Sequence, residues 1–142
     1  MSSSTDATPG GNGRLSDAPA GAEAGLPVLV VDDDPKVREV AVWALEDEGF
    51  TVDAAGNRQQ AVERAQKRRP ALVVLDMGLP PDNGDTVAAD LRAACGERLP
   101  ILVITADGRA SEKAQRVGAF AYLHKPFDVE ELVRLVRGQL AA

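Results

Sequence analysis

The segment VLVVDDDP, residues 28–35, places an uninterrupted apolar run directly before three aspartates and a proline. Four apolar residues in succession are typical of a strand that is buried on both faces, as in a parallel sheet. The three carboxylates add nothing to a hydrophobic core, so their position at the end of this strand requires a separate explanation. Pro35 suits the first turn of a helix, and we expect Asp34 to cap that helix rather than to bind a metal ion.

The composition narrows the classes of protein to consider. The chain has 142 residues, which is enough for one domain with its own core, and its aromatic content of 4% predicts that this core is aliphatic. A net charge of −6 argues against a nucleic-acid surface. The one basic cluster, residues 67–69, stands where a helix is expected to end.

The cysteine content and the hydropathy of the chain predict its location. Cys95 is the only cysteine, so an internal disulfide is excluded and a reducing compartment is expected. The N-terminal residues lack the pattern of a signal peptide, and no apolar run approaches the roughly 18 residues of a membrane span. We therefore expect a cytoplasmic protein without a membrane partner.

Residues 1–26 differ in composition from the rest of the chain. They are rich in Ser, Gly, Ala and Pro and contain no aromatic residue. Such a segment cannot bury enough apolar surface to offset the entropy lost on ordering. We therefore expect a flexible tail over residues 1–26 and one folded domain over residues 27–142.

The rest of the chain alternates between strand and helix patterns. Strands are predicted at residues 27–31, 50–55, 71–76, 101–105 and 119–124. Helices are expected after Asp34, after Asn57, after the turn at 80–85, at about 112–117 and after Asp128. On the first helix the periodicity predicts one inward apolar face, formed by Val37, Val40, Ala41, Ala44 and Leu45. This order predicts an α/β fold, with a five-stranded parallel sheet covered by helices on both faces.

Polar residues stand at the carboxyl ends of four predicted strands. Asp32 and Asp33 follow the first strand, Asp76 ends the third, Thr105 ends the fourth and Lys125 follows the fifth. Ligands of open parallel sheets bind at this edge. Two carboxylates about 4 Å apart repel by roughly 1 kcal/mol in water and by more in a shielded cleft, so a cation is needed there. Mg²⁺ fits this all-oxygen site, whereas zinc would require His or Cys.

Carboxylates around a metal, together with a lysine and a hydroxyl group, are suited to phosphoryl transfer. The transition state spreads negative charge over three oxygens, so the protein mainly positions groups and neutralises charge. Asp76 is the candidate nucleophile, which would form an acyl phosphate. Lys125 would place a positive charge against a phosphate oxygen, and Thr105 would donate a hydrogen bond from its hydroxyl group.

Over about residues 27–140 the sequence resembles the receiver domain of two-component response regulators. VLVVDDDP resembles the acidic-pair motif of that family, and LVVLDMGLPPDNG resembles its phosphorylation-site motif, with Pro80 and Gly84 following Asp76 at the family's spacing. ITA is similar to the family's segment with the switch hydroxyl group, which would here belong to Thr105. YLHKPF is similar to the segment with the family's lysine, which would here be Lys125. Each motif is weak alone, but four in this order at strand ends are specific.

The resemblance implies a fold, a cofactor and a phosphoacceptor. The fold would be the doubly wound, flavodoxin-like fold of CheY-like proteins, with strand order 2-1-3-4-5. Mg²⁺ would be bound by Asp32, Asp33, Asp76 and the backbone carbonyl of Gly78. Asp76 would accept a phosphoryl group from a histidine kinase or a histidine phosphotransfer protein, and the Lys125–Pro126 peptide bond would be cis.

The resemblance also implies how the signal leaves the domain. Phosphorylation would draw Thr105 toward Asp76, and Tyr122 would turn inward. A downstream protein would then bind the changed surface of the fourth helix, the fifth strand and the last helix, and this change could also produce a homodimer. Such a domain is a phosphoacceptor that catalyses only its own phosphotransfer and dephosphorylation, and it binds no nucleic acid directly.

The sequence favours a free-standing receiver and leaves three alternatives open. The chain could be a receiver fragment of a larger regulator or hybrid kinase, or an interaction module that needs no phosphorylation. A magnesium-dependent aspartyl-phosphate phosphatase would use the same chemistry, but it normally has a second acid two residues after the nucleophile, where Gly78 stands. The absence of a side chain at Gly78 also predicts ready entry of water or of a partner's imidazole. Asp107 adds a negative charge near Thr105, and Pro81 stiffens the loop after Asp76.

Overall fold

The computed structural model describes residues 26–141. The tail expected at residues 1–26 therefore lies, except for Leu26, outside the described residues. Among the described residues no helix is both long enough and apolar enough to cross a bilayer.

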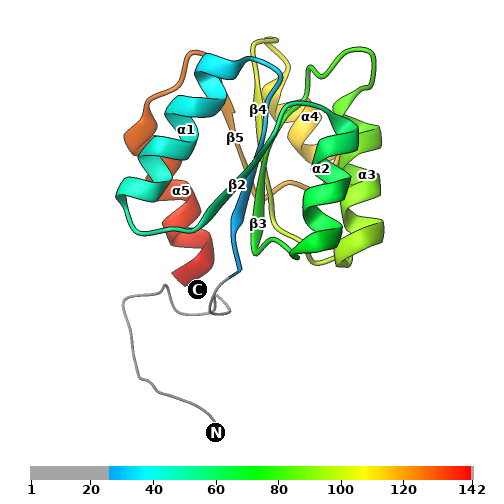
Figure 1. Ribbon diagram of the computed structural model, residues 1–142. Helices are drawn as coiled ribbons and strands as arrows, with labels where there is room; N and C mark the ends of the chain where they lie inside the picture. The colour runs from blue at the N-terminus through cyan, green and yellow to red at the C-terminus, as the bar shows by residue number, and fades with distance from the viewer. Residues whose placement is uncertain (1–25, 142) are drawn as a thin grey trace, which may run out of the picture.

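Five parallel strands form one sheet in the centre of the domain (Figure 1). They are β1 (Val28–Val31), β2 (Val52–Ala55), β3 (Leu72–Asp76), β4 (Ile101–Thr105) and β5 (Ala121–His124). Their spatial order is β2-β1-β3-β4-β5, and every neighbouring pair is parallel. The predicted doubly wound sheet and its order are confirmed.

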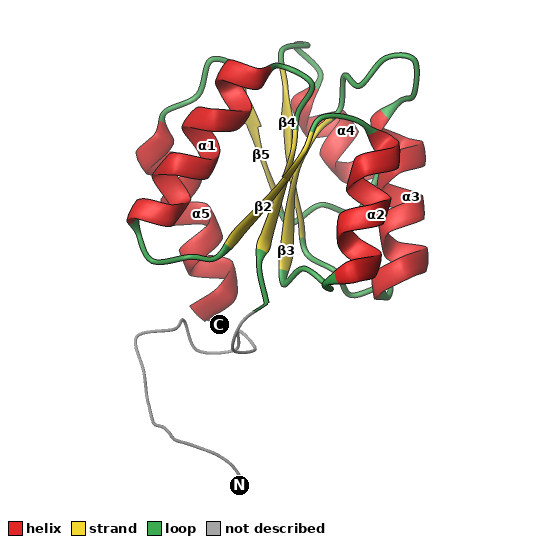
Figure 2. Ribbon diagram, in the orientation of Figure 1, coloured by secondary structure: helices red, strands yellow, loops and turns green. Residues whose placement is uncertain are grey.

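Within residues 26–141, five helices cover the sheet in two layers (Figure 2). They are α1 (Pro35–Asp47), α2 (Arg58–Lys67), α3 (Gly84–Cys95), α4 (Ala110–Arg116) and α5 (Val129–Ala141). Helices α1 and α5 pack on one face of the sheet, whereas α2, α3 and α4 pack on the other. Cys95 is buried at the end of α3, as expected for a core position.

The two layers explain why the strand sequences do not alternate in polarity. Successive side chains of a strand point to opposite faces of the sheet. Val28 and Val30 contact the core beneath α1 and α5, while Leu29 and Val31 contact the core beneath α2, α3 and α4. All four residues of β1 are buried, so an uninterrupted apolar run is what this position requires.

Side-chain caps begin several helices where the sequence predicts them. The Oδ1 atom of Asp34 accepts hydrogen bonds from the backbone N–H groups of Lys36, at 2.9 Å, and Val37, at 3.4 Å. The side chain of Asn57 caps α2 by accepting the N–H of Gln60 at 2.9 Å. The expectation that Asp34 is a cap is confirmed, and this separates it from the two aspartates before it.

Several details differ from the sequence prediction. Strand β2 begins at Val52 and strand β5 at Ala121, each two residues later than expected, and α4 begins at Ala110, two residues earlier. Strand β5 starts late because the N–H of Ala119 bonds to the carbonyl of Ala114 in α4, at 2.9 Å, instead of joining the sheet. The prediction that Val40 faces inward is wrong, since its side chain is 48% exposed. The inward arc of α1 consists of Ala41, Ala44 and Leu45, and Val40 lies about 100° around the helix from Ala41.

Alanine substitutions at two helical glycines should change the free energy of unfolding in opposite directions. A Cβ atom on Gly84 would lie 2.7 Å from the Cα atom of Met77, and the N–H of Gly84 bonds to the carbonyl of Met77 at 3.2 Å. Gly138 lies within α5, and a Cβ atom there would have no neighbour within 4 Å. We expect Gly84→Ala to lower the free energy of unfolding by about 1–3 kcal/mol through overpacking. Gly138→Ala should raise it by about 0.5–1 kcal/mol through higher helix propensity.

Urea unfolding of both variants beside the parent protein measures these changes. The same direction of change in the two variants would contradict the packing described for Gly84.

Candidate functional site

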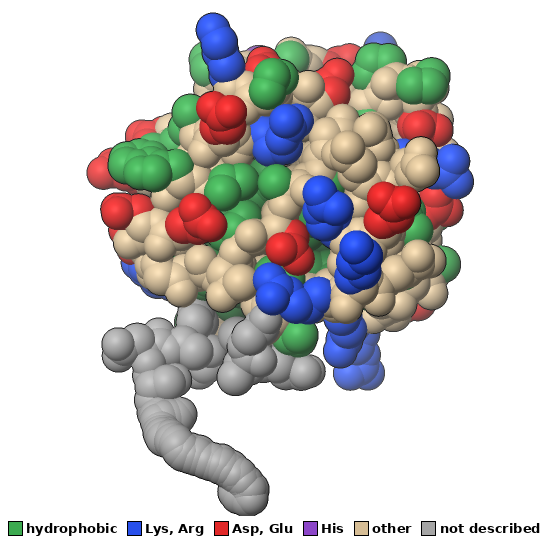
Figure 3. Space-filling model, viewed as in Figure 1, with side chains coloured by type: hydrophobic (Ala, Val, Ile, Leu, Met, Phe, Trp, Pro, Cys, Tyr) green, Lys and Arg blue, Asp and Glu red, His purple; other side chains and the backbone are tan. Residues whose placement is uncertain are grey.

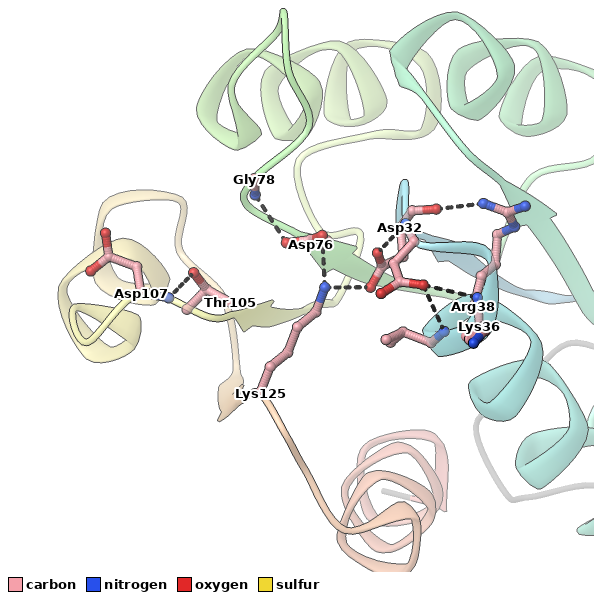
Figure 4. A network of polar contacts seen from close by, with 10 residues as sticks. Asp32, Lys36, Arg38, Asp76, Gly78, Thr105, Asp107 and Lys125 are labelled. Carbon is pink, nitrogen blue, oxygen red and sulfur yellow. Dashed lines mark hydrogen bonds and ion pairs between the residues drawn. The ribbon is translucent and has the colours of Figure 1, made fainter.

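The carboxyl ends of four strands bring the predicted site residues to one edge of the sheet. Asp32 directly follows β1, Asp76 ends β3, Thr105 ends β4 and Lys125 directly follows β5. Because β1, β3, β4 and β5 are consecutive neighbours in the sheet, these side chains lie together although they are far apart in sequence (Figure 4).

Lys125 links the two buried carboxylates of the site. Its Nζ atom lies 2.9 Å from the Oδ2 atom of Asp76 and 2.9 Å from the Oδ2 atom of Asp32. The backbone N–H of Lys125 bonds to the carbonyl of Thr105 at 2.8 Å, which fixes the start of the side chain beside β4. The Lys125–Pro126 peptide bond is cis, as the resemblance implied, and the Pro80–Pro81 bond after the acceptor strand is also cis.

Three aspartates form an acidic cluster at this edge. One carboxylate oxygen from each of Asp32, Asp33 and Asp76 lies within 4.8 Å of the others. Asp32 is fully buried and Asp76 nearly so, whereas Asp33 is exposed. Asp34, whose side chain caps α1, lies outside this cluster.

The Oδ2 atom of Asp32 can accept a further ligand. Its Oδ1 atom accepts the N–H of Asp34 at 2.9 Å, and its backbone carbonyl accepts a hydrogen bond from Arg38 at 2.8 Å. Its Oδ2 atom is buried and, among the described residues, has the ion pair with Lys125 but no partner in hydrogen-bond geometry. An incompletely satisfied oxygen within an all-carboxylate cluster fits Mg²⁺, which takes oxygen ligands and keeps several waters.

Burial and charge shift the pKa values of this group of residues. Burial raises the pKa of Asp76 from 3.8 to about 6, although the N–H of Gly78 and the ammonium of Lys125 act in the opposite direction. Burial alone would lower the pKa of Lys125, but its contacts with Asp32 and Asp76 outweigh that effect and raise it. Lys125 is therefore charged at neutral pH, and Asp76 is mainly ionised there.

Gly78 holds the carboxylate of Asp76 through its backbone and places no side chain beside it. The backbone N–H of Gly78 bonds to the Oδ1 atom of Asp76 at 2.9 Å, and the residue is exposed. A Cβ atom on Gly78 would lie 3.7 Å from that same oxygen, which is an ordinary van der Waals distance. The site therefore accommodates a side chain at this position, beside a carboxylate that is itself nearly fully buried. Metal binding by the carbonyl of Gly78 stays a prediction.

The hydroxyl group of Thr105 is engaged by the loop that follows β4. Its Oγ1 atom accepts the backbone N–H of Asp107 at 3.1 Å. The carboxylate of Asp107 accepts the N–H of Arg109 at 2.9 Å and lies 3.4 Å from the Nζ atom of Lys113 in α4. Within the part of the chain that the structure describes, no hydrogen bond joins Thr105 to Asp76. The N–H of Arg109 and then Lys113 hold the pKa of Asp107 below its usual range, so its carboxylate is charged at neutral pH.

Two basic residues contact the site although no sequence motif predicts their contacts. Arg38 contacts the backbone of Asp32 from α1, and Lys113 contacts Asp107 from α4. Both resemble ordinary basic residues of helix surfaces, and their contacts depend on how each helix is turned. The predicted switch residue Tyr122 lies on β5 with 48% of its surface exposed.

Basic and acidic side chains are mixed on the face of the domain that Figure 3 draws. Figure 3 shows basic side chains over the lower part of this view, with acidic side chains among them. Helix α2 ends at Lys67, at the start of the basic cluster of residues 67–69, and Arg68 pairs with Asp53 at 3.3 Å. As predicted, these basic residues stand at a helix C-terminus.

Comparison with known proteins gives consistent results. A sequence model of the response regulator receiver domain matches residues 28–137. The chain is 40% identical over 120 residues to response regulator Rre1 of a Synechocystis species, covering 82% of this chain and 52% of that protein. It is 42% identical over 115 residues to response regulator MprA of Mycobacterium ulcerans, covering 80% of this chain and 49% of that protein. This chain therefore spans about half the length of both regulators.

The fold comparison agrees with the sequence comparison. The crystal structure of the chemotaxis protein CheY4 of Vibrio cholerae aligns with a TM-score of 0.74 at 30% identity, covering 81% of this chain and 98% of that one. With the family match over residues 28–137 and the strand order β2-β1-β3-β4-β5, the chain belongs to the family of response regulator receiver domains.

Proposed function

We propose that this receiver accepts a phosphoryl group on Asp76, in a Mg²⁺-dependent reaction, from a histidine kinase or a histidine phosphotransfer protein. The position of Lys125 carries the proposal, since its ammonium contacts both Asp76 and Asp32 at 2.9 Å beside the acidic cluster. A partly buried lysine that joins two carboxylates at a ligand-binding sheet edge fits the charge neutralisation that phosphoryl transfer requires.

The residues present account for each part of the transfer. An ionised oxygen of Asp76 attacks phosphorus, the bond from phosphorus to the donor's imidazole nitrogen breaks, and the imidazole keeps the electron pair and takes up a proton. The N–H of Gly78 holds the other carboxylate oxygen in place. Lys125 offers its positive charge to the phosphoryl oxygens as the charge on Asp76 is consumed. The product is an acyl phosphate on Asp76.

Asp32, Asp33 and Asp76, with the backbone carbonyl of Gly78, would hold the metal ion. When bound, Mg²⁺ supplies positive charge to the phosphoryl oxygens and offsets the repulsion among the carboxylates. Asp32 supports this assignment because its Oδ2 atom is buried without a hydrogen bond from the described residues.

The switch would use Thr105 and Tyr122. Thr105 is buried at the end of β4, where a small rotation would direct its hydroxyl group toward a phosphoryl group on Asp76. Tyr122 is half-exposed on β5, and its side chain would turn inward when Thr105 moves. Partner proteins would bind the surface formed by α4, β5 and α5, and phosphorylation could also favour a homodimer through it.

Phosphorylation of the purified protein tests the proposal directly. Incubation with Mg²⁺ and a small phosphodonor should add the mass of one phosphoryl group, as measured by intact mass spectrometry. The gain should disappear in Asp76→Asn and persist in Asp47→Asn, which removes an exposed carboxylate of α1 outside the cluster. No gain with any donor would support a phosphorylation-independent interaction module, and turnover of a generic phosphate ester would support a phosphatase.

The raised pKa of Asp76 predicts how the stability of the metal-free protein depends on pH. The folded protein binds the proton of Asp76 more tightly than the unfolded chain does, so the free energy of unfolding falls as pH rises from about 4 through about 6. The substitution Asp76→Asn removes the carboxylate and therefore this loss of stability at high pH. It should raise the free energy of unfolding by on the order of 1–3 kcal/mol near pH 8, and by progressively less as the pH falls toward 4.

Urea unfolding in the presence of a chelator measures this difference, with Asp47→Asn as the control. Added Mg²⁺ should stabilise the parent protein but have little effect on Asp76→Asn. A destabilised Asp76→Asn variant near pH 8 would contradict the electrostatic description of the cluster.

The absence of a side chain at Gly78 predicts the lifetime of the phosphoryl group on Asp76. A methionine side chain at this position would start 3.7 Å from the Oδ1 atom of Asp76 and would cover the approach of water. We expect Gly78→Met to slow hydrolysis of the phosphorylated protein by several-fold, measured as loss of the phosphoryl mass after removal of the donor. Gly138→Met, on α5 and with no neighbour within 4 Å of a Cβ atom, is a control away from this site. An unchanged hydrolysis rate in Gly78→Met would refute this role for Gly78.

A further inference from the structure

The loop between β4 and α4 contains contacts that the proposed chemistry does not use. Asp107 lies two residues after Thr105, and its groups engage three different partners. Its backbone N–H donates to the Oγ1 atom of Thr105 at 3.1 Å, and its Oδ1 atom accepts the N–H of Arg109 at 2.9 Å. Its Oδ2 atom lies 3.4 Å from the Nζ atom of Lys113. A single residue thus connects the switch hydroxyl to helix α4.

The two contacts of the Asp107 carboxylate differ in how far they reach along the chain. The bond to Arg109 is local, because it closes a turn two residues long. The contact with Lys113 spans six residues and ties the loop to the body of α4. Helix α4 begins, within the described residues, without a side-chain cap at Arg109, so Asp107 is the carboxylate that secures this end of the helix.

The opposite end of α4 is held in a different way. Arg92 of α3 donates hydrogen bonds from its guanidinium to the carbonyls of Val117 and Gly118, and Arg116 pairs with Asp85 at 3.0 Å. The C-terminal end of α4 is therefore fastened to α3, whereas its N-terminal end is fastened to the loop through Asp107 and Lys113.

Rotation of the Thr105 hydroxyl group toward a phosphoryl group on Asp76 would disturb the contacts of Asp107. The hydroxyl must either leave the N–H of Asp107 or pull the loop with it. Figure 4 shows Thr105 bonded to Asp107 on one side of the site, while Lys125 reaches toward Asp76 and Asp32 on the other. Because the carboxylate of Asp107 is tied to Lys113, movement of the loop stretches that ion pair.

We propose that Asp107 and Lys113 form a restraint that holds the switch in its resting arrangement and so lowers the affinity of the site for a phosphoryl group. Asp107 is a positioning residue in this inference, since it acts through Thr105. The inference rests on the proposed phosphoacceptor function of Asp76. An exposed ion pair changes an equilibrium constant by at most about fivefold, so the effect is a modest one.

Binding of beryllofluoride, a mimic of the phosphoryl group on aspartate, tests the restraint. The dissociation constant is measured by titration calorimetry of the full chain in excess Mg²⁺. Asp107→Asn keeps an oxygen that accepts the N–H of Arg109 but loses the ion pair with Lys113. Lys113→Gln loses the same pair from the other side. We expect each variant to bind beryllofluoride about two- to fivefold more tightly than the parent chain.

Lys113→Gln separates the restraint from a simple charge effect. Removing a positive charge near an anion site should weaken anion binding if only the local field matters. The restraint predicts the opposite, namely tighter binding. Lys67→Gln, which removes a positive charge at the end of α2, is the matched control and should leave the dissociation constant unchanged.

The double variant and the salt dependence complete the test. Because both substitutions break one contact, Asp107→Asn with Lys113→Gln should bind no more tightly than either single variant. High salt should reduce the difference between the parent and the variants. Weaker or unchanged binding in Lys113→Gln would overturn the inference alone. Absence of beryllofluoride binding by the parent chain would instead overturn the proposed function and the inference with it.

Discussion

The ion pairs of Lys125 with two buried carboxylates are the interaction on which the site depends. Burying Asp32 and Asp76 side by side is unfavourable, because each carboxylate loses water and repels the other. One ammonium group at 2.9 Å from both carboxylates offsets part of that cost. Three carboxylates against one ammonium still leave an excess of negative charge, which favours a divalent cation at this edge. Burial remains the main cause of the raised pKa of Asp76, and the charge of Asp32 adds to it.

The sheet makes this charge arrangement possible. Asp32, Asp76, Thr105 and Lys125 each stand at the end of a different strand, and the strands are held by apolar side chains on both faces. The two cores fix the spacing of the strands, and the spacing of the strands fixes the distances between the charges. The chemistry therefore depends on the packing of residues that never touch the site.

The sequence was sufficient to predict the fold and the meeting of polar residues from four strand ends at one edge of the sheet. Apolar runs identify buried strands, and Asp34 and Asn57 mark helix starts because capping is a local interaction. The exposure of Val40 and the contact of Lys113 with Asp107 could not be predicted in this way. Both depend on the rotation of a helix about its axis, which is set by packing against distant elements rather than by local periodicity.

The two ends of α4 are held by different contacts, and this difference affects where a partner protein would sense the switch. Arg92 secures the last turn of the helix through backbone carbonyls, while the first turn is held by side chains that solvent reaches. A helix held in this way would pivot near Gly118 when its first turn moves. Displacement at Thr105 would then be largest at the N-terminal end of α4 and would fade along its length. A protein that binds near residues 109–113 would sense the switch strongly, whereas one that binds near residues 116–118 would sense little of it.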